Sequence, residues 1–413
     1  MAVNNEGVQF CFIADDLTGA MDTGVGLAKA GLVAIIAFST CATVESEAVV
    51  VTTDSRAASA ADAYRHVRSV GERFRDHLIY KKIDSTLRGN IAAELQALLD
   101  ATGVKHTIVC PAFPAIRRTV VKGHLFVDGI PVSETQFSRD PVSPVKKSDI
   151  GEVLRTGSGI ETDYIDIRDV ERGPEHIAQL VNSSKARATV IDATEDSHLR
   201  CIAEALALSE EPWLPCGSGG LGAQIPLAYG HEPVGRAIPP APKGPALLAV
   251  GSRNEVSIRQ LQRLLDTLQS PLVRAEPREF KTRDGRTPRM NQLAHEIDGL
   301  LDAHDVVVLS SSLSQFSPQM RHAMAPVLGG IVSHLLESRT LAGLFLCGGD
   351  VARSVCGDNG IQALRILGDL QPGVIAGEAA GDNYEGMRVI TKAGGFGDED
   401  AMVQVARHFS KGG

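Results

Sequence analysis

The sequence is poor in aromatic residues, in clustered cysteines and in long apolar runs. Aromatic residues make up 4% of the 413 residues, and the seven cysteines are scattered, odd in number and without a CxxC pair. We therefore expect reduced thiols rather than a disulfide framework or a cysteine-rich metal site. Because no apolar run approaches the ~18 residues of a membrane-spanning helix and the N-terminus lacks an export signal, we expect a cytoplasmic protein without a membrane partner.

Several patterns of nucleic-acid and nucleotide binding are also missing. The formal net charge is −9 and no basic stripe occurs, which argues against nucleic acid as a partner. The absence of GxxxxGK[ST] excludes a P-loop enzyme. No GxGxxG is followed by an acidic residue about 20 positions later, which disfavours dinucleotide binding.

The chain is rich in glycine, with 41 residues, and in short apolar runs that alternate with helical patterns. This alternation predicts an α/β fold in which a largely parallel sheet is flanked by helices. In the first half, strands are expected within 8–14, 33–39, 48–55, 77–83, 106–113, 162–167 and 188–193, and helices within 18–31, 59–76 and 90–103.

A second alternation follows residues 230–245, a Pro- and Gly-rich stretch without apolar periodicity. The length predicts about two domains. We place the first at 1–229, a linker at 230–245 and the second at 246–413. In the second domain, strands are expected within 246–252, 305–312, 341–350 and 387–397, and helices at 257–269, in a long region through 334–338, and at 398–409.

Residues 119–145 interrupt the alternation of the first domain. The pair Asp128-Gly129 predicts a tight turn and a hairpin over 124–135. Such an excursion either covers a binding site or decorates the surface, and the sequence leaves both alternatives open.

Polar clusters follow four expected strands of the first domain, where ligands bind in open parallel sheets. One aspartate at such a turn is usually a helix N-cap, but capping does not need arginine. Carboxylates suit hydroxyl groups, and cations suit a carboxylate or phosphate, so the set predicts a site for a small polyhydroxy acid. The candidate residues are Asp15, Asp16, Arg56, Lys82, Asp84, Ser85, Thr86, Arg88 and Arg118.

Three glycine-rich turns follow expected strands of the second domain, at 251–252, 348–350 and 392–397. Glycine lets backbone amides approach a phosphate, so the turns predict a polyphosphate site. Lys392 is expected to neutralise phosphate charge, with an exposed surface lysine as the alternative. Together the two domains suit phosphoryl transfer from a nucleotide to a hydroxyl, at an active site in a cleft between them.

Several stretches, taken in order, resemble the four-carbon acid sugar kinases. They are ADDLTGAMDTG, TDSRA, KKIDSTLRGN, PAFP with the RT and G that follow it, GSR, GGDVA, PGV and KAGGFG. The resemblance spans both domains. It implies an N-terminal sugar-acid domain, a C-terminal ATP domain, and phosphorylation of the terminal hydroxyl of a four-carbon sugar acid with ATP and a divalent metal such as Mg²⁺.

The resemblance also implies roles for individual residues. Sugar-acid contacts are expected from Asp15, Asp16, Arg56, Lys82, Asp84, Ser85 and Arg88. ATP contacts are expected from Ser252, Gly348, Gly349, Asp350, Val351, Gly394 and Gly395. The ligands of the metal are not predicted.

The stretch KKIDSTLRGN is similar to the corresponding stretch of the D-threonate and D-erythronate kinase branch. In 3-oxo-tetronate kinases, Cys and Phe are expected before DST. We favour D-threonate as substrate and 4-phospho-D-threonate as product, with D-erythronate and 3-oxo-tetronate as alternatives. Two positions depart from the family pattern. Ile116 and Arg117 precede Arg118 where relatives often have Gly before the Arg, and Val351 stands where Thr is common.

The sequence does not identify the catalytic base, for which Asp16 and Asp84 are the candidates. One hypothesis is that Asp84→Asn loses most kcat while the fold survives. Two alternatives from other classes are a non-catalytic sugar-acid sensor and a nicotinamide-dependent dehydrogenase. A homodimer is compatible with all of these interpretations.

Overall fold

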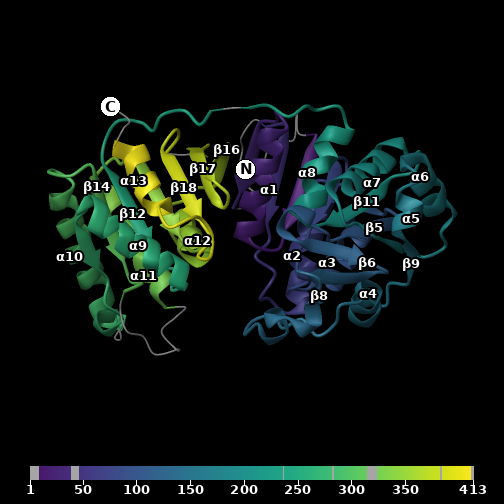
Figure 1. The fold of residues 1–413 in the computed structure, drawn as a ribbon. Coiled ribbons are helices and arrows are strands. Elements are labelled where there is room, and N and C mark those ends of the chain that lie inside the picture. Colours follow the sequence, from purple (N-terminus) through teal and green to yellow (C-terminus); the bar gives the residue numbers. More distant parts are fainter. Residues whose placement is uncertain are drawn as a thin grey trace. The chain divides into compact units, whose positions relative to one another are not determined.

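The computed structural model describes residues 9–38, 46–235, 237–280, 283–313, 323–381 and 384–410. Cys41 and part of the long helical region expected before residue 338 lie outside the described residues. The chain forms two compact units, each built as an α/β fold (Figure 1). The first unit contains residues 9–36 and 46–235, and the second contains residues 37–38 and the chain from 237 onward.

The strands of the first unit lie in the order β2-β3-β1-β4-β11-β5-β10-β9. From β3 to β9, each strand runs parallel to its neighbours, as the alternation predicts. All residues of β1 are buried, because helices cover both faces of the sheet. The strands are β1 (Phe10–Ala14), β2 (Ala34–Ala37), β3 (Ala48–Thr52), β4 (Leu78–Lys82), β5 (His106–Cys110), β9 (Thr162–Ile165), β10 (Ala188–Ile191) and β11 (Trp213–Gly217).

The helices of the first unit form two groups of contacting neighbours. One group contains α1, α8, α7, α6 and α5, and the other contains α2, α3 and α4. Two groups are what a sheet covered on both faces requires. The helices are α1 (Leu17–Lys29), α2 (Ala60–Arg73), α3 (Ile91–Thr102), α4 (Ile150–Ser158), α5 (Ile167–Val170), α6 (Pro174–Ser183), α7 (Asp196–Leu208) and α8 (Gly219–Ala228).

Strand β11 is absent from the sequence-based prediction, although it lies between β4 and β5 near the middle of the sheet. The run WLPCG is short and contains Pro215, a residue that central strands disfavour because it has no N–H. This strand separates the carboxyl ends of β4 and β5, so Arg118, which follows β5, lies farther from the residues that follow β4 than the sequence suggested.

The hairpin predicted after β5 is confirmed. Strands β6 (Arg118–Val121), β7 (His124–Val127) and β8 (Ile130–Pro131) form a small antiparallel sheet. Asp128 and Gly129 make the turn with φ of 52° and 80°, the left-handed values of a type I′ hairpin.

The strands of the second unit lie in the order β13-β14-β12-β15-β18-β17-β16. The pairings from β13 to β18 are parallel, whereas β17 is antiparallel to both β18 and β16. The strands are β12 (Ala246–Val250), β13 (Leu272–Arg274), β14 (Val306–Ser310), β15 (Gly343–Cys347), β16 (Ala363–Gln371), β17 (Val374–Ala380) and β18 (Arg388–Lys392), and the helices are α9 (Glu255–Leu268), α10 (Arg283–Leu300), α11 (Met324–Ser338), α12 (Gly349–Asp358) and α13 (Ala401–Ser410).

The hairpin of β16 and β17 was not predicted, nor were the edge strand β13 and helix α10. In β16, only three of nine residues are buried, so its apolar pattern is weak. The sheet is therefore largely parallel, as expected, with an antiparallel end.

Between α8 and β12, the described residues form no helix or strand. The guanidinium of Arg388, on β18, donates to the carbonyls of Pro239 and Pro240 at 3.0 and 3.3 Å. These bonds attach the second half of the Pro- and Gly-rich stretch to the second unit. Among the described helices, none has the length and apolarity needed to cross a membrane.

Close packing at the end of β11 gives a test of the first unit. A Cβ at Gly217 would lie 2.4 Å from the carbonyl oxygen of Cys110 and 2.7 Å from the Tyr80 hydroxyl. Gly217→Ala should therefore lower the free energy of unfolding by about 1–3 kcal/mol, the usual effect of overpacking. Urea unfolding followed by fluorescence measures it, because the single tryptophan, Trp213, lies in the same unit.

The matched control is Gly26→Ala in α1, where the added Cβ would meet Ala223 at an ordinary 3.6 Å. This variant should be as stable as the wild type or slightly more stable, because alanine favours helix. Equal loss in both variants would contradict the close approach at Gly217.

Candidate functional site

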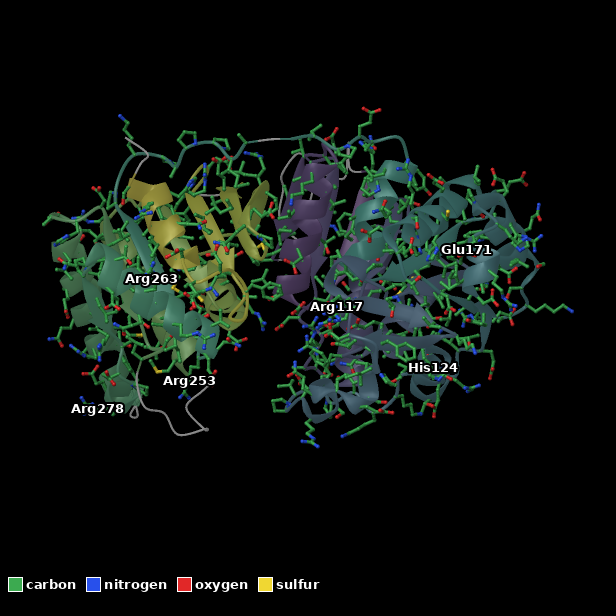
Figure 2. All side chains as sticks on the ribbon, viewed as in Figure 1. Arg117, His124, Glu171, Arg253, Arg263 and Arg278 are labelled. Carbon is green, nitrogen blue, oxygen red and sulfur yellow. The ribbon has the colours of Figure 1, made fainter. Side chains whose placement is uncertain are left out.

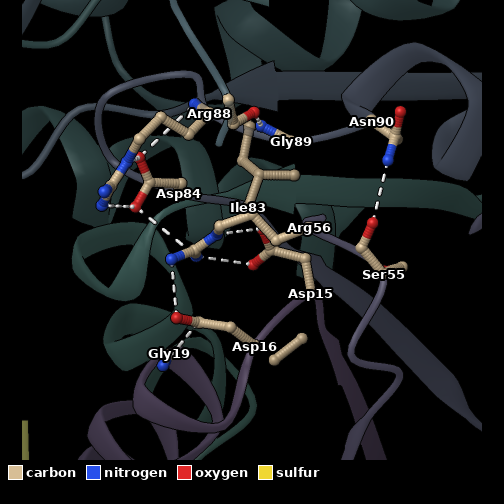
Figure 3. A network of polar contacts seen from close by, with 12 residues as sticks. Asp15, Asp16, Gly19, Ser55, Arg56, Ile83, Asp84, Arg88, Gly89 and Asn90 are labelled. Carbon is tan, nitrogen blue, oxygen red and sulfur yellow. Dashed lines mark hydrogen bonds and ion pairs between the residues drawn. The ribbon is translucent and has the colours of Figure 1, made fainter. Parts of the chain in front are cut away.

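The principal polar cluster forms where three neighbouring strands end. Strand β1 lies between β3 and β4, and Ala14 is in register with both Thr52 and Lys82. Because the strands are parallel, the residues that follow them emerge at one edge of the sheet. Asp15 and Asp16, Arg56, and Asp84 and Arg88 are brought together there (Figure 3).

Arg56 is at the centre of the cluster. Its Nε and Nη2 donate to the two oxygens of Asp15 at 2.7 and 2.9 Å, and its Nη1 donates to Asp16 at 2.6 Å. Nη2 also lies 3.5 Å from Asp84 Oδ1. One guanidinium thus bridges three carboxylates, which favours its charged form and raises the pKa of Arg56 further above its usual range.

Asp84 is held on both oxygens. Oδ1 accepts from Arg88 Nη2 at 3.0 Å, and Oδ2 accepts from Arg88 Nε at 3.0 Å and from the backbone N–H of Thr86 at 3.1 Å. The Thr86 hydroxyl donates to Oδ2 as well. Burial alone would raise the pKa of Asp84, but Arg56 and Arg88 lower it below its usual range.

Asp16 has a different environment. It caps α1 by accepting from the N–H of Gly19 at 2.9 Å, so the N-cap alternative is correct for this residue. Its side chain is 21% exposed, against 2% for Asp15 and 10% for Asp84. Burial raises the pKa of Asp16 and so does the Asp15 charge, although Arg56 and Lys82 oppose the shift. Of these three carboxylates, Asp16 is the most accessible to a ligand.

Lys82 lies beside Asp16 at the end of β4. Its ammonium is buried and donates to the Ile83 carbonyl at 3.0 Å, which uses one of its three protons. A Cβ at Gly219, the first residue of α8, would be 3.9 Å from Lys82 Cε. The N-terminal end of α8 therefore adds its positive potential near the ammonium, which makes this corner favourable for an anion.

The remaining predicted residues of the first unit lie differently. Thr86 is buried and supports Asp84, and Ser85 is partly exposed in the turn after Asp84. Arg118 donates to the carbonyl of Ile116 at 2.6 Å and lies 3.7 Å from Asp128. It follows β5, and β11 separates that strand from β4. Among the contacts of the described residues, none joins Arg118 to the cluster at Arg56.

Neighbouring charges of the hairpin point outward. The side chain of Arg117 is 78% exposed and lies 3.2 Å from Asp128. Charged side chains such as those of Arg117, Glu171 and Arg263 are spread over the surfaces of both units (Figure 2).

The segment after the hairpin contacts the site through Arg88. The Arg88 guanidinium lies 5.4 Å from the centre of the Phe137 ring and 3.3 Å from Asp140. The N–H of Gly89 donates to Ser143 at 2.7 Å. Thus the excursion is not only a surface decoration, because residues 137–143 pack against one side of the cluster. Sequence reasoning identified the excursion but not these three residues.

The second unit has a cavity of about 420 Å³ at the carboxyl ends of its central strands. Six predicted residues line it, namely Ser252, Gly348, Gly349, Asp350, Val351 and Gly394. Strands β12, β15 and β18 are parallel neighbours, so their glycine-rich turns meet at one edge. Helices α9 and α12 begin there, and their N-termini favour an anion.

Gly394 permits the closest approach within this cavity. A Cβ at this position would lie 2.3 Å from Ser252 Oγ, so a larger residue must displace either the Ser252 side chain or the turn. Gly395, also predicted as a contact, is not among the lining residues.

Sequence reasoning missed three lining residues that follow β12 and β14: Arg253, Asn254 and Ser311. Ser311 is the most informative, because its hydroxyl is buried and has no hydrogen-bond partner among the described residues. The serines at 310–312 stand directly after an apolar strand, a signal that could have identified them.

Lys392 is buried, so the exposed surface lysine is wrong. Its ammonium donates to the carbonyls of Ala393, Gly394 and Phe396 at 3.0–3.2 Å and to Ser257 Oγ at 3.2 Å. Burial lowers the pKa of Lys392. These bonds hold the glycine-rich turn from inside, and its contact with a phosphate stays a prediction.

Comparison with known families assigns a different kind of ligand to each unit, as the two sets of polar residues suggest. Residues 10–225 match a sugar-binding N-terminal domain, and residues 247–402 match a nucleotide-binding C-terminal domain. A relative from Salmonella typhimurium, named D-threonate kinase, is 30% identical over 94% of this chain and 96% of its own. A Bordetella bronchiseptica relative of the same name is 31% identical, with 96% of each chain covered.

Relatives with other names are somewhat less similar. A D-erythronate kinase from Heliobacterium modesticaldum is 27% identical over 94% of each chain, and a 3-oxo-tetronate kinase from Burkholderia multivorans is 28% identical over 96% of each chain. A solved structure from Salmonella typhimurium shares the fold, with a TM-score of 0.84 at 22% identity over 97% of this chain and 99% of its own.

A sugar-binding and a nucleotide-binding domain in one chain, together with relatives that are named kinases, identify a phosphotransferase of the sugar-kinase class. The chain belongs to the four-carbon acid sugar kinase family. The resemblance found in the sequence is therefore confirmed.

The charges around Asp84 predict a pH-dependent contribution to stability. Its folded-state pKa is lowered, so its stabilisation is fully present above the unfolded value near 3.8 and is lost progressively as the pH falls from that value through the lowered folded-state pKa. Asp84→Asn should lower the free energy of unfolding by about 3 kcal/mol at pH 7, because Arg88 and Arg56 each lose one of their charged partners. The difference from wild type should shrink below pH 4.

Urea unfolding followed by Trp213 fluorescence at pH 7 and at about pH 2 measures this difference, because most of the stabilisation is lost only well below the unfolded pKa. The control is Asp76→Asn, because the Asp76 side chain is 85% exposed and should contribute little. A loss for Asp84→Asn that stays constant with pH would contradict the charge-based explanation.

A substitution in the glycine-rich turn at Gly394 is expected to weaken nucleotide binding specifically. Gly394→Ala should raise the KM for the nucleotide at least about tenfold, since the new Cβ would displace Ser252 or the turn. The control is Gly357→Ala, near the far end of α12, where a Cβ would meet nothing within 4 Å. A wild-type nucleotide KM in Gly394→Ala would exclude this turn from the site.

Proposed function

We propose that the protein transfers the γ-phosphoryl group of ATP to the 4-hydroxyl of D-threonate, giving 4-phospho-D-threonate and ADP. The observation that supports it most directly is the cluster of three carboxylates around Arg56, with Lys82 beside it. Carboxylates accept from the hydroxyl groups of a sugar acid, and the lysine suits its carboxylate. The preference for D-threonate rests on KKIDSTLRGN and on the names of the relatives at 30–31% identity.

The corner formed by Lys82 and the start of α8 is our proposed site for the substrate carboxylate. Arg56 makes bonds to Asp15 and Asp16 and Arg88 makes bonds to Asp84, so both arginines mainly hold the carboxylates in position. Within the part of the chain that the structure describes, the Lys82 ammonium donates one hydrogen bond, and its burial strengthens its attraction for an anion.

Asp16 is our proposed general base. Asp84 is held on both oxygens by Arg88 and is strongly stabilised as an anion, so it is a weak proton acceptor. Both oxygens of Asp15 are bound to Arg56 and buried. Asp16 is more exposed, and its raised pKa suits proton transfer. It would accept the hydroxyl proton as the oxygen bonds to phosphorus and ADP leaves.

The cavity of the second unit is our proposed nucleotide site. Its glycine-rich turns and helix N-termini suit the phosphate chain, and the Ser311 hydroxyl is free to bond with the ligand. The Asp350 side chain lines the cavity and is 65% exposed, so it can supply one oxygen to Mg²⁺. When bound, that ion would neutralise phosphate charge during transfer. The interdomain cleft, the domain boundaries at 229 and 246, and a homodimer stay predictions.

A coupled assay of ADP release over D-threonate, L-threonate, D-erythronate and 3-oxo-tetronates tests the substrate. D-threonate should give the highest kcat/KM, by about tenfold or more if one hydroxyl contact discriminates the stereoisomers. Faster turnover of D-erythronate would make that acid the substrate. Binding of D-threonate without any ATP consumption would instead support the sensor alternative.

The pH dependence of kcat distinguishes Asp16 from Asp84. In the wild type, kcat should fall as the pH decreases through the raised pKa of Asp16, with a midpoint above the ordinary carboxyl value of 3.8. Asp16→Asn should lose about 10²–10⁴ in kcat and also this acidic limb. Asp84→Asn should keep the limb in its residual activity. If Asp16→Asn retained the limb, another group would be the base.

A further inference from the structure

Behind the site lies a buried ion pair that the proposed mechanism does not use. Lys81 Nζ lies 2.9 Å from Glu94 Oε2, and the two side chains are 0% and 1% exposed. Lys81 precedes Lys82 on β4, so the two side chains point to opposite faces of the sheet. Glu94 lies in the first turn of α3.

Lys81 joins the ends of two strands. Besides Glu94, its ammonium donates to the carbonyl of Ile13 at 3.1 Å and to that of Lys82 at 2.8 Å. All three protons therefore have acceptors. Ile13 lies on β1 directly before Ala14 and the aspartates of the site, so the ammonium holds both strand ends at the edge where the cluster forms.

Glu94 extends this network to the third strand end. Its Oε1 accepts from the buried hydroxyl of Ser55, and Ser55 Oγ also lies 2.7 Å from the Thr53 hydroxyl. Asn90, the residue before α3, donates to the carbonyl of Ser55 at 2.8 Å (Figure 3) and to that of Ala58 at 3.0 Å. The start of α3 therefore holds the turn after β3 through both a carboxylate and an amide.

This turn carries Arg56. Asp54 adopts a left-handed φ of 51°, and the N–H of Arg56 donates to the carbonyl of Asp15 at 3.2 Å. Because Ser55 directly precedes Arg56, a shift of the Ser55 hydroxyl would move the guanidinium that bridges three carboxylates.

A buried ion pair is weak as a source of stability, since apolar residues of similar volume often do as well. Its effect here is to fix a geometry. We propose that Glu94, charged and held by Lys81, is a positioning residue that fixes Ser55 and thereby the orientation of Arg56 for sugar-acid binding. This inference rests on the proposed function.

Ser55→Ala is the principal test, because it removes one hydroxyl and leaves the ion pair intact. Its KM for D-threonate should rise about tenfold, the effect of losing one hydrogen bond to a charged group, while the KM for ATP stays unchanged. Glu94→Gln should likewise raise the KM for D-threonate and leave the KM for ATP unchanged. Hydrogen exchange of the backbone amides in 53–58 should become faster in both variants.

The matched control is Thr107→Val, which removes another buried hydroxyl of the same unit, one that donates to the Leu214 carbonyl at 2.7 Å near the start of β5. It should lower stability as Ser55→Ala does, yet keep the wild-type KM and the wild-type exchange in 53–58. This comparison separates positioning from a general loss of stability.

Wild-type KM and exchange in Ser55→Ala would overturn the inference, as would an equal rise of KM in Thr107→Val. A wild type that does not phosphorylate any sugar acid would overturn the proposed function instead. In that case the exchange of 53–58 in Ser55→Ala, compared with Thr107→Val, still decides whether Glu94 fixes the turn.

Discussion

The arrangement of the polar cluster in the first unit depends on one feature, the position of the Arg56 guanidinium between three carboxylates. Asp15, Asp16 and Asp84 would repel one another if they were gathered at the sheet edge without a cation between them. Arg56 supplies that cation and bonds directly to two of them, while Arg88 completes the partners of Asp84. The two guanidinium groups therefore favour the ionised form of Asp84 although its side chain is buried.

The two units solve the problem of ligand binding by different means. In the first, the proposed site consists of charged side chains, and a buried ion pair of Lys81 and Glu94 lies behind them. In the second, the proposed site consists mainly of backbone turns, and a buried lysine, Lys392, donates to the carbonyls of one turn from inside. Side chains suit the particular hydroxyl pattern of a sugar acid, whereas backbone amides suit phosphate oxygens.

The geometry of the cluster also explains why the pKa values of Asp16 and Asp84 shift in opposite directions. Asp84 accepts from two groups of Arg88 and so stays ionised, while Asp16 is more exposed and has a raised pKa. Carboxylates with the same chemistry thus acquire different proton affinities from their neighbours. Residues 137–143 pack against Arg88 from one side, through Phe137 and Asp140.

The sequence by itself determined the fold class, the family and most of the polar residues at strand ends, because apolar periodicity and turn chemistry are local properties. It did not reveal β11, because Pro215 is a residue that central strands disfavour. Without β11, the sequence-based prediction grouped Arg118, which follows β5, with residues that follow β4, two strands away. It could not show that Arg56 bridges three carboxylates, that Glu94 holds Ser55, or that Lys392 is buried. Those facts join segments far apart in the chain, and only strand order and packing decide which of them meet.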